Sequence, residues 1–585
     1  MSLDIPVDTT VESLQHLLLC ARGEKPCDLV LKNASVINIF SNEIITGDVG
    51  ICGNRIAGIG KYSGNRELDL NGKYLSPGFI EGHIHIESSM LSPHRFAEAV
   101  VPKGTTTVIC DPHEIANVLG LEGVRYMLEC TEGTPLDIFA MVPSCVPATH
   151  LETSGATLAS DDIGRLLEQP GVAGLGEMMN FPGTIYGDGE VLMKLGEALT
   201  RDMVIDGHAP DVGGKELQAY CAAGISSDHE CTTIEEAREK LRAGMYIFIR
   251  EGSTAKNLEA LLPLVTPATC NRFLLVSDDR HPDDLFSKGH LDAILRRAVA
   301  LGIDALSALR MVTINPAERF NLKMRGAIAP GYLADLVVLS DLTNFLVEQV
   351  YKEGHLVADK KRPITSQPTS TAADTDNRLM QSVNIDWQKV DFRIPMHGQK
   401  KKIRVIDCIE DQIITGMSEI EPTIADGYAV ADPTRDLLKI SVIERHHAGG
   451  NMTNGFVRGF GFDNGAIAST VAHDSHNLIV VGTDDDLMLA ASRLVADNGG
   501  GLSLVHGDKS LVLPLPIAGL MSNQPPATVA DQLASINRMA RRMGVRVKNP
   551  YMLLSFLALP VIPTLKITDK GLVDVTKFAF TPLWV

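Results

Sequence analysis

Two histidines two residues apart offer the clearest chemistry in this sequence. His83 and His85 stand in a short apolar run at residues 80–86, which follows the turn-forming pair Pro77-Gly78. Side chains two apart on a strand point to the same face of a sheet, and two imidazoles on one face can bind one metal ion. The pair therefore predicts half of a metal site. Two polar histidines at a strand end are the alternative at this point.

Histidines and carboxylates also end several apolar runs that come later in the chain. They are Glu177, His208, His229 and Asp278. Two divalent ions need about this many nitrogen and oxygen ligands, and one carboxylate can bridge the two ions. Such a pair of ions can hold a bridging hydroxide as a nucleophile. The joint pattern therefore predicts a binuclear metal site, provided that the fold brings these residues together.

The elements that must position these residues are eight apolar runs that alternate with helical segments between residues 75 and 325. The runs are 80–86, 106–110, 138–142, 172–177, 203–208, 225–229, 246–250 and 273–278, and the clearest helical segments are 114–130, 234–243 and 288–301. Eight strand–helix units in about 240 residues predict a closed (β/α)8 TIM barrel, an α/β fold in which the carboxyl ends of the strands surround the active site. An open doubly wound sheet ranks second, because no Gly-x-Gly-x-x-Gly loop follows the first run.

The segments on both sides of the predicted barrel are richer in short strands. Residues 1–74 begin with an amphipathic helix at 9–22 and continue with strand-like runs, and residues 326–362 have the same character. The strands expected in the second segment are 326–328, 336–339 and 346–351. We expect both segments to build one small flanking β-sandwich. Pro, Ser and Thr in residues 363–380 predict a linker, and residues 381–585 predict a C-terminal α/β domain of unassigned order.

Composition limits the classes of function. The 585 residues carry a net charge of −19, which argues against a nucleic-acid-binding surface. The sequence contains no apolar run near the roughly 20 residues that span a bilayer, and its start lacks a signal-peptide pattern. Ten cysteines without a Cys-x-x-Cys pair are typical of reduced thiols, so we expect a cytoplasmic protein. A barrel with an added domain also suggests a homodimer.

Longer stretches carry a resemblance to a known family. The order His-x-His, carboxylate, His, His, Asp on eight strands resembles the amidohydrolase superfamily, and within it the chain is similar to the bacterial adenine deaminase family. The matching stretches are Gly82–Pro93, Asp111–Asn117, Leu175–Pro182, Asp206–Pro210, Val471–Asn477 and Leu515–Ser522. The resemblance runs from about residue 25 to the C-terminus, which includes the added domain.

The resemblance implies both a reaction and a set of ligands. The family converts adenine to hypoxanthine and ammonia in purine salvage, by attack of a metal-bridging hydroxide on the amino-bearing ring carbon, with two divalent ions, manganese or iron. The implied ligands are His83 and His85 for the more buried ion, Glu177 as the bridge, and His208 and His229 for the second ion. Asp278 would bind the first ion and take the proton of the hydroxide.

A general acid must protonate the purine ring or the departing amine. The residue types and positions leave three candidates open, which are Glu87, Glu251 and Asp279. Mononuclear purine-nucleoside deaminases place a glutamate three residues after the histidine of the fifth strand. In this chain that position is Asp211, so the analogy does not identify the acid.

Two further polar clusters have open roles. Asp111, His113 and Glu114 follow the second strand, where they are expected either to contact substrate or a further metal, or to cap the next helix. In the C-terminal domain, residues 473–476 read His-Asp-Ser-His, close to His446-His447. We expect that segment to form a polar loop over the barrel mouth or at a subunit contact. A nucleophilic triad around Ser475 is disfavoured, because nothing suggests an elbow or an oxyanion hole.

Two other functions compete with adenine deamination. A binuclear metal hydrolase of a cyclic amide or of another aminopurine would share every ligand and differ in the shape of its pocket. A non-catalytic barrel that binds a ligand is disfavoured because the full ligand set is present.

Overall fold

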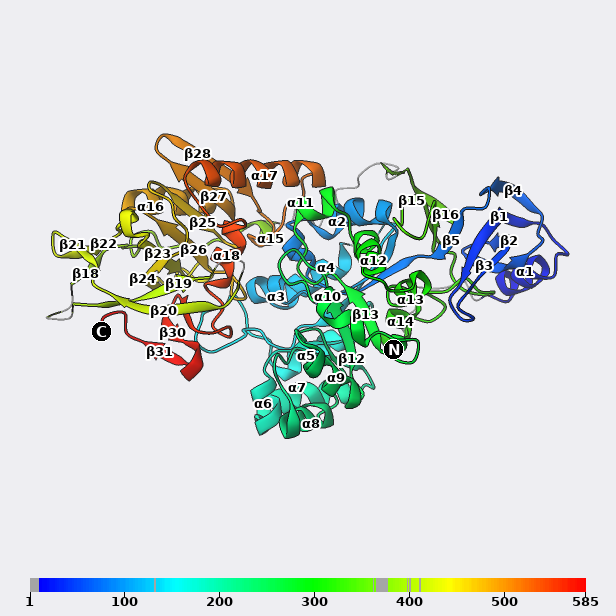
Figure 1. The fold of residues 1–585 in the computed structure, drawn as a ribbon, viewed down its shortest axis with the longest axis horizontal. Coiled ribbons are helices and arrows are strands. Elements are labelled where there is room, and N and C mark those ends of the chain that lie inside the picture. The colour runs from blue at the N-terminus through cyan, green and yellow to red at the C-terminus, as the bar shows by residue number, and fades with distance from the viewer. Residues whose placement is uncertain are drawn as a thin grey trace.

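The computed structural model describes residues 10–130, 133–360, 362–364, 377–396, 398, 401–409 and 412–585. Figure 1 shows a sheet built from the blue N-terminal strands, a central strand–helix body in cyan and green, and a C-terminal domain in yellow to red. Residues 365–376 of the predicted linker lie outside the described residues. Among the helices that are described, none is both long and apolar enough to cross a membrane.

Eight parallel strands form the central body. They are β6 (Phe79–Ile84), β7 (Thr105–Cys110), β8 (Asp137–Val142), β9 (Val172–Met178), β10 (Val204–Gly207), β11 (Ser227–Asp228), β12 (Tyr246–Arg250) and β13 (Phe273–Val276). Strands β6 to β10 pair in sequence order, as do β11 to β13. The ring closes where the Asp278 N–H donates to the His83 carbonyl at 3.1 Å and where Ser226 N–H donates to the Ile205 carbonyl at 3.3 Å. The predicted (β/α)8 barrel is therefore confirmed.

Helices follow the barrel strands along the chain. They are α2 (Pro93–Val100), α3 (His113–Leu119), α4 (Leu121–Glu129), α5 (Ser160–Leu167), α6 (Phe181–Tyr186), α7 (Gly189–Leu199), α8 (Gly214–Ala222), α9 (Ile234–Arg242), α10 (Leu258–Leu261), α11 (Pro282–Ser287), α12 (Leu291–Ala300), α13 (Ala305–Arg310) and α14 (Ile314–Arg319), with short 3-10 turns η1 (Ile86–Ser89), η2 (Val101–Lys103), η3 (Leu262–Leu264) and η4 (Cys270–Arg272). The single helix predicted at 114–130 is wrong, because Gly120 adopts φ +59° and separates α3 from α4.

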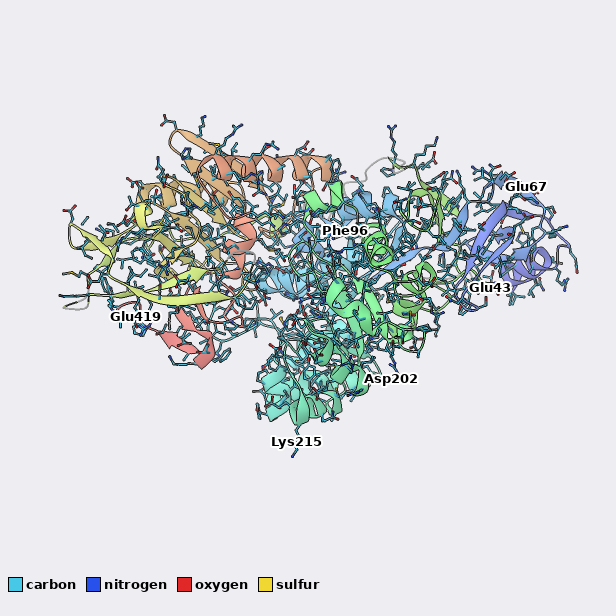
Figure 2. All side chains as sticks on the ribbon, viewed as in Figure 1. Glu43, Glu67, Phe96, Asp202, Lys215 and Glu419 are labelled. Atoms are coloured by element: carbon cyan, nitrogen blue, oxygen red, sulfur yellow. The ribbon has the colours of Figure 1, made fainter. Side chains whose placement is uncertain are left out.

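Large apolar side chains fill the barrel and the layer beneath its helices. Ile80, Phe139, Phe248 and Leu274 pack together inside the strands, so the barrel is a solid core with its chemistry at one end. In Figure 2, Phe96 of α2 lies within the body of the protein, and it is fully buried. The charged side chains that this figure labels lie on exposed positions; they are Glu43, Glu67, Asp202, Lys215 and Glu419.

Both flanks of the barrel contribute to one nine-stranded sheet, as predicted. Helix α1 (Val11–Ala21) accompanies β1 (Cys27–Asn38), β2 (Glu43–Cys52), β3 (Arg55–Gly60), β4 (Gly64–Asp69), β5 (Tyr74–Pro77), β14 (Leu336–Leu339), β15 (Val347–Lys352), β16 (His355–Asp359) and β17 (Arg362–Pro363). The two flanks join where β14 pairs with β5 in antiparallel register. Residues 326–328, expected as a strand, form none; Gly326 there adopts φ +77°, which does not suit a strand.

The C-terminal domain is built on an eight-stranded sheet, whose order is β20-β19-β24-β23-β26-β25-β27-β28. Its elements are α15 (Asn377–Met380), β18 (Ile394–Pro395), β19 (Ile403–Cys408), β20 (Thr415–Ile420), β21 (Thr423–Ala425), β22 (Tyr428–Val430), η6 (Pro433–Arg435), β23 (Leu438–Ile443), β24 (Met452–Arg458), β25 (Ala466–Ser469), β26 (Leu478–Gly482), α16 (Asp485–Asp497), β27 (Gly501–His506), β28 (Lys509–Pro514), α17 (Pro526–Arg542), α18 (Pro550–Phe556), β29 (Leu565–Thr568), β30 (Gly571–Asp574), η7 (Val575–Lys577) and β31 (Ala579–Thr581).

The C-terminal domain packs on the barrel. Helix α17 lies beside α11 and α2, as Figure 1 shows. Backbone hydrogen bonds join Ser522 to both Met90 and Ser92 at 2.9 Å. On the other side, the Asn477 side chain donates to the Thr153 carbonyl at 2.8 Å. These contacts bring residues of the C-terminal domain to the end of the barrel where the strands terminate.

Candidate active site

The metal ligands predicted from the sequence lie together at the carboxyl ends of the barrel strands. His83 belongs to β6 and His85 follows it, while Glu177 belongs to β9. His208 and His229 come directly after β10 and β11, and Asp278 is the second residue after β13. Because the strands run parallel, their ends meet on one face of the barrel. All these side chains are buried except that of His208, which is 24% exposed.

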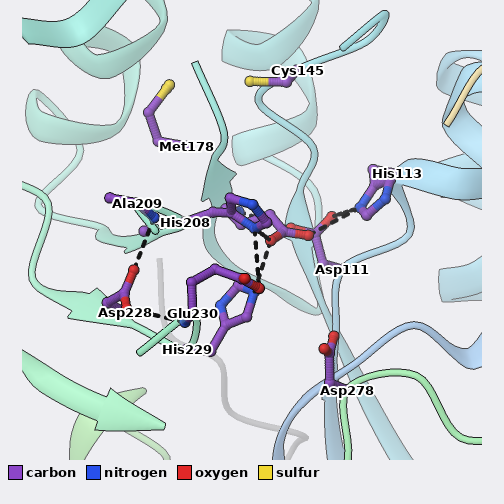
Figure 3. Close-up of polar contacts among 12 residues, drawn as sticks. Asp111, His113, Cys145, Met178, His208, Ala209, Asp228, His229, Glu230 and Asp278 are labelled. Atoms are coloured by element: carbon purple, nitrogen blue, oxygen red, sulfur yellow. Dashed lines mark hydrogen bonds and ion pairs between the residues drawn. The ribbon is translucent and has the colours of Figure 1, made fainter. Parts of the chain in front are cut away.

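Glu177 stands at the centre of the cluster. Its Oε2 lies 2.8 Å from His208 Nδ1 and 3.0 Å from His229 Nε2. Its Oε1 lies 3.4 Å from His85 Nε2 and 3.3 Å from His113 Nδ1. Figure 3 shows His208, His229 and Glu230 meeting in the middle of the site, with Asp111 and His113 beside them. One carboxylate thus separates two groups of imidazoles, which is the arrangement that a bridging ligand requires.

Asp278 lies beside His83 and His85 in this cluster. Its Oδ1 lies 3.1 Å from His85 Nε2 and 3.4 Å from His83 Nε2. Its Oδ2 accepts a hydrogen bond from Arg250 Nη1 at 3.1 Å. The residue adopts φ +54°, an uncommon conformation for a residue with a side chain. The strand-closing hydrogen bond to His83 and the Arg250 contact hold that conformation, so one carboxylate oxygen faces the histidines and the other is fixed.

The donor set fits divalent metal ions. Donor atoms lie within 4.8 Å of one another in three overlapping groups, which are His83–His229–Asp278, His83–His85–Glu177 and Glu177–His208–His229. Among the described residues, His83 Nε2 and His113 Nδ1 are buried without a partner in hydrogen-bond geometry. Buried polar atoms in native proteins normally have partners. Imidazole nitrogens and carboxylate oxygens are ligands for divalent transition ions, so a bound ion would satisfy His83 Nε2, which belongs to two of these groups.

Charges within the cluster compensate one another. Burial alone would raise the pKa of Glu177, but the imidazoles of His229 and His208 hold that pKa well below its usual range. Burial likewise opposes protonation of His208, yet the Glu230 and Glu177 carboxylates raise its pKa to about 9. When no divalent ion is bound, protons on the imidazoles therefore neutralise the negative charge of the carboxylates. Because a histidine ligand must be neutral, metal binding competes with these protons.

Residues outside the ligand set orient the ligands. Asp111 Oδ2 accepts from the Glu177 backbone N–H at 2.8 Å, and the Asp111 carbonyl oxygen lies 2.9 Å from His85 Nδ1. Asp111 thereby fixes the position of one ligand and the ring orientation of another. Partners of this kind commonly set the affinity of a metal site.

A buried ion pair supports the loops that carry His208 and His229. Lys240 and Asp228 are fully buried, with Lys240 Nζ 3.0 Å from Asp228 Oδ2. Lys240 Nζ also donates to the Ala209 carbonyl at 2.6 Å, while the Ala209 N–H donates to Asp228 Oδ1 at 2.8 Å. The pair therefore links the residues that directly follow His208 to the end of β11.

Replacing Lys240 by methionine is expected to destabilise the barrel. The Lys240→Met variant would leave the Asp228 carboxylate buried without its charge partner, which typically costs about 3–5 kcal/mol. We expect a lower midpoint of urea unfolding and faster loss of bound metal. Lys288→Met is the matched control, because Lys288 pairs with Asp284 on the surface and is 55% exposed. Equal midpoints for the two variants would contradict this role for Lys240.

The three candidates for the general acid have different surroundings. Glu87 is buried on η1, where its Oε1 accepts from the Ile115 N–H at 3.1 Å and its Oε2 has no hydrogen-bond partner among the described residues. Glu251 Oε1 pairs with Arg297 at 3.1 Å, and its Oε2 has no hydrogen-bond partner among the described residues. Asp279 accepts from the Ser88 hydroxyl at 2.5 Å. Glu87 is thus the candidate with an unpaired oxygen and without a charged partner at salt-bridge distance.

Glu87 lines a narrow cavity between the barrel and the C-terminal domain. The barrel side of this cavity also includes Ser88, Met90 and His281. The C-terminal domain contributes the other wall, which is Val471, His473, Leu502, Tyr551, Met552 and Ser555. Because both walls are needed, the added domain helps to enclose the barrel mouth.

Of the polar residues that follow β7, His113 and Glu114 have different neighbours. His113 joins the metal-ligand cluster, with its ring centroid 4.5 Å from that of His85. Glu114 instead turns to the C-terminal domain, where its Oε1 lies 2.9 Å from His473 Nδ1 and its Oε2 contacts His476 Nε2. The His473 ring stacks on Phe556 with centroids 4.7 Å apart. The loop at 471–477 therefore lies over the barrel mouth, which is one of the two positions predicted for it.

Ser475 contacts residues of its own domain and the Glu152 side chain. Its Oγ accepts from Asn477 Nδ2 at 3.2 Å, and its carbonyl lies 2.7 Å from His446 Nε2. Asp211, the residue three after His208, is exposed, and its N–H donates to Glu236. Neither residue is in contact with the metal-ligand cluster through these bonds.

Sequence reasoning did not assign a role to Glu230 or Arg250. Glu230 Oε1 lies 3.4 Å from His229 Nε2, and its Oε2 accepts from Arg250 Nη2 at 3.2 Å. Arg250 in turn contacts Asp278, so it joins the two sides of the site. Both residues lie at carboxyl ends of barrel strands, and that position is the signal by which they could have been found.

A (β/α)8 barrel with histidine and carboxylate donors at its strand ends is the fold and site of a metal-dependent hydrolase class, and sequence comparison identifies that class. The sequence model of the Amidohydrolase family matches residues 74–357, which span the barrel and the adjoining sheet strands. A second model, described as the adenine deaminase C-terminal domain, matches residues 412–579. The resemblance to the amidohydrolases predicted from the strand-end motifs is therefore confirmed.

Relatives of nearly the same length identify the family within that class. The chain is 51% identical to the adenine deaminase of Desulfatibacillum aliphaticivorans, over 97% of this chain and 99% of that protein. It is 47% identical to adenine deaminase 2 of Carboxydothermus hydrogenoformans, over 98% and 100% of the two chains. The chain belongs to the adenine deaminase family. Among solved structures, a mutant atrazine chlorohydrolase from Arthrobacter aurescens is 16% identical with a TM-score of 0.46, over 58% of this chain and 97% of that one.

Proposed function

We propose that this chain hydrolyses adenine to hypoxanthine and ammonia at the mouth of the barrel, with the Glu177-centred cluster holding two divalent metal ions. The position of Glu177 between two groups of imidazoles carries the proposal, because that arrangement suits a pair of ions. Membership of the adenine deaminase family supports adenine as the substrate. The reaction belongs to purine salvage.

The donor types favour particular ions. His83, His85 and Asp278 would hold the first ion, His208 and His229 the second, and Glu177 would bridge them. Nitrogen and oxygen donors without a thiolate suit manganese or iron. Bound divalent ions lower the pKa of water, so that hydroxide is available near neutral pH to attack the weakly electrophilic ring carbon.

A side chain of the protein, Asp278, accepts the proton of the attacking water in this proposal. Asp278 presents one oxygen toward His83 and His85, and this oxygen is placed to accept that proton. Arg250 binds the other oxygen of Asp278 at 3.1 Å and prevents the carboxylate from rotating away. The proposed general base is therefore fixed before substrate binds, which is how positioned groups lower a barrier.

Glu87 is the proposed general acid. It lines the cavity beside the mouth and has an oxygen without a hydrogen-bond partner among the described residues. Glu251 also has an unpaired oxygen, but it has Arg297 as a charge partner, whereas Glu87 has none at salt-bridge distance among the described residues. Asp279 accepts a hydrogen bond from the Ser88 hydroxyl. A protonated Glu87 carboxyl can donate to a ring nitrogen or to the departing amine.

Changing Glu87 to glutamine is expected to slow turnover without removing metal. General acid catalysis contributes about 10²–10⁴-fold, so kcat of the Glu87→Gln variant should fall by about that factor at unchanged metal content. Glu251→Gln is the matched control and should lose far less activity, since Glu251 contacts Arg297. Steady-state ammonia release and metal analysis measure both effects. A larger loss in Glu251→Gln than in Glu87→Gln would reverse the assignment.

Product analysis tests the proposed reaction. Metal-replete protein, loaded separately with manganese and iron, is incubated with adenine, and hypoxanthine and ammonia are quantified. Equal amounts of the two products are expected. Absence of adenine turnover in metal-loaded protein would overturn the proposal. Turnover of another aminopurine or a cyclic amide by the same preparation would then favour the rival metal hydrolase, which shares every ligand.

The cellular setting is also part of the proposal. The structure pairs none of the ten cysteines in a disulfide, as suits a reducing cytoplasm. A closed two-fold homodimer is the commonest assembly of soluble oligomers. Light scattering on the purified protein is expected to give twice the mass of one chain, and a monomer mass would contradict the dimer.

A further inference from the structure

A second group of side chains of the types that bind metal ions lies where α1 packs on the N-terminal sheet, away from the barrel mouth. Cys20 is one of the two buried residues of α1, the other being Leu17. Cys27 at the start of β1 and Cys52 at the end of β2 are buried in the same cluster. Figure 1 shows α1 against β2 and β3, at the opposite end of the molecule from the C-terminal domain.

The sulfur and nitrogen atoms in this cluster are close to one another. Cys20 Sγ lies 3.1 Å from Cys52 Sγ and 3.9 Å from His16 Nε2. The donor atoms of these three residues all lie within 4.8 Å of one another. Cys27 is buried in the same apolar cluster as Cys20 and Cys52. Two thiols and an imidazole therefore meet in one place, and the Cys27 side chain is buried beside them.

The local structure explains how donors from three elements, α1, β1 and β2, converge. His16 and Cys20 are four residues apart on α1, so they share one face of the helix. Leu29 pairs with Ile51 in the antiparallel β1–β2 hairpin, which brings Cys27 and Cys52 to the same end of it. Cys27 Sγ fits because Gly50 has no side chain; a Cβ there would lie 2.7 Å from the sulfur.

We propose that His16, Cys20, Cys27 and Cys52 bind a zinc ion that fastens α1 to the N-terminal sheet. A Cys3His set is a common ligand set of structural zinc sites, and soft thiolates favour zinc over the ions suited to the barrel mouth. Binding releases the three thiol protons, because thiolates are the ligands. All four positions are occupied by the protein, so the site is structural and leaves none for substrate.

The packing of α1 gives the ion a function. Three of the larger apolar side chains of α1 are exposed, Val11 at 74%, Leu14 at 46% and Leu18 at 51%. Few apolar contacts therefore hold the helix on the sheet. A metal ion that joins α1 to β1 and β2 would add an attachment at the centre of this small interface. This proposal does not depend on the deaminase activity.

Cobalt substitution of the full-length protein tests the site. The ligands proposed at the barrel mouth are nitrogen and oxygen atoms, so thiolate-to-cobalt charge-transfer absorption would report the second site alone. Wild-type protein reconstituted with cobalt is expected to show this absorption and to bind zinc competitively, with loss of the band. Absence of the band at saturating cobalt would overturn the proposal, and this measurement needs no variant.

Variants locate the site and distinguish a metal centre from a disulfide. Cys20→Ser is expected to remove the band and one metal equivalent per chain while adenine turnover is retained. His16→Ala is the milder second variant, expected to weaken zinc binding at least tenfold, by analogy with lost metal contacts. Cys221→Ser on α8 is the control and should keep the band. Persistence of the absorption band in Cys20→Ser would overturn the assignment. A count of eight thiols in the unfolded protein, two fewer than its ten cysteines, would also overturn it, because it would indicate a Cys20–Cys52 disulfide.

Discussion

Replacing His83 by alanine is expected to abolish adenine deamination and metal binding at the barrel mouth together. His83 Nε2 is buried, lies 3.4 Å from Asp278, and its ring stacks on His229 with centroids 4.2 Å apart. It therefore contacts ligands of both proposed ions. Metal activation of water supplies several kcal/mol of catalysis, and each 1.36 kcal/mol is about tenfold in rate. We expect kcat/KM to fall by about 10³-fold or more.

Metal loss and misfolding are separated by measuring metal content and ammonia release on the same His83→Ala preparation, beside a circular dichroism spectrum. His355→Ala is the control, because His355 lies exposed on β16, away from the barrel strands. Wild-type activity in His83→Ala, at any metal content, would show that the ligand assignment is wrong.

The second large effect is expected from Asp278→Asn. The amide keeps the shape of the carboxylate and can still contact Arg250, but it cannot accept the proton of the attacking water. Loss of a general base costs about 10²–10⁴-fold in kcat. Because a negative ligand is also lost, we expect weaker binding of the first ion. Adding metal to saturation should restore occupancy but not the rate.

A neighbouring carboxylate provides the comparison for Asp278. Asp279 follows it directly and accepts a hydrogen bond from Ser88, so Asp279→Asn changes the same charge without touching the histidines. Its rate should remain far closer to that of the wild type. Full recovery of Asp278→Asn at saturating metal would contradict a role in proton transfer and leave only metal binding.

The barrel could be predicted from sequence because its strands are buried on both faces. Such strands appear as short apolar runs, and His83, His208 and His229 mark the points at which three of them end. The helix expected at 114–130 failed at Gly120, since the sequence does not show that this glycine adopts a left-handed conformation there. Element type was thus easier to predict than element boundaries.

Contacts between distant parts of the chain could not be predicted. The sequence offered Glu87, Glu251 and Asp279 as equivalent acids, and only the positions of Arg297 and Ser88 distinguish them. The contact between Glu114 and His473 joins the barrel to the C-terminal domain, and no periodicity in the sequence encodes such a pairing. Tertiary structure decides these roles because partners arrive from other elements.

Metal reconstitution of a single preparation tests the central claim most directly. Protein freed of metal by a chelator is titrated with manganese, and both bound metal at the barrel mouth and hypoxanthine formation from adenine are followed. The Glu177-centred site predicts no turnover without metal and full turnover when two ions per chain are bound there. Full adenine turnover by the metal-free protein would contradict the account.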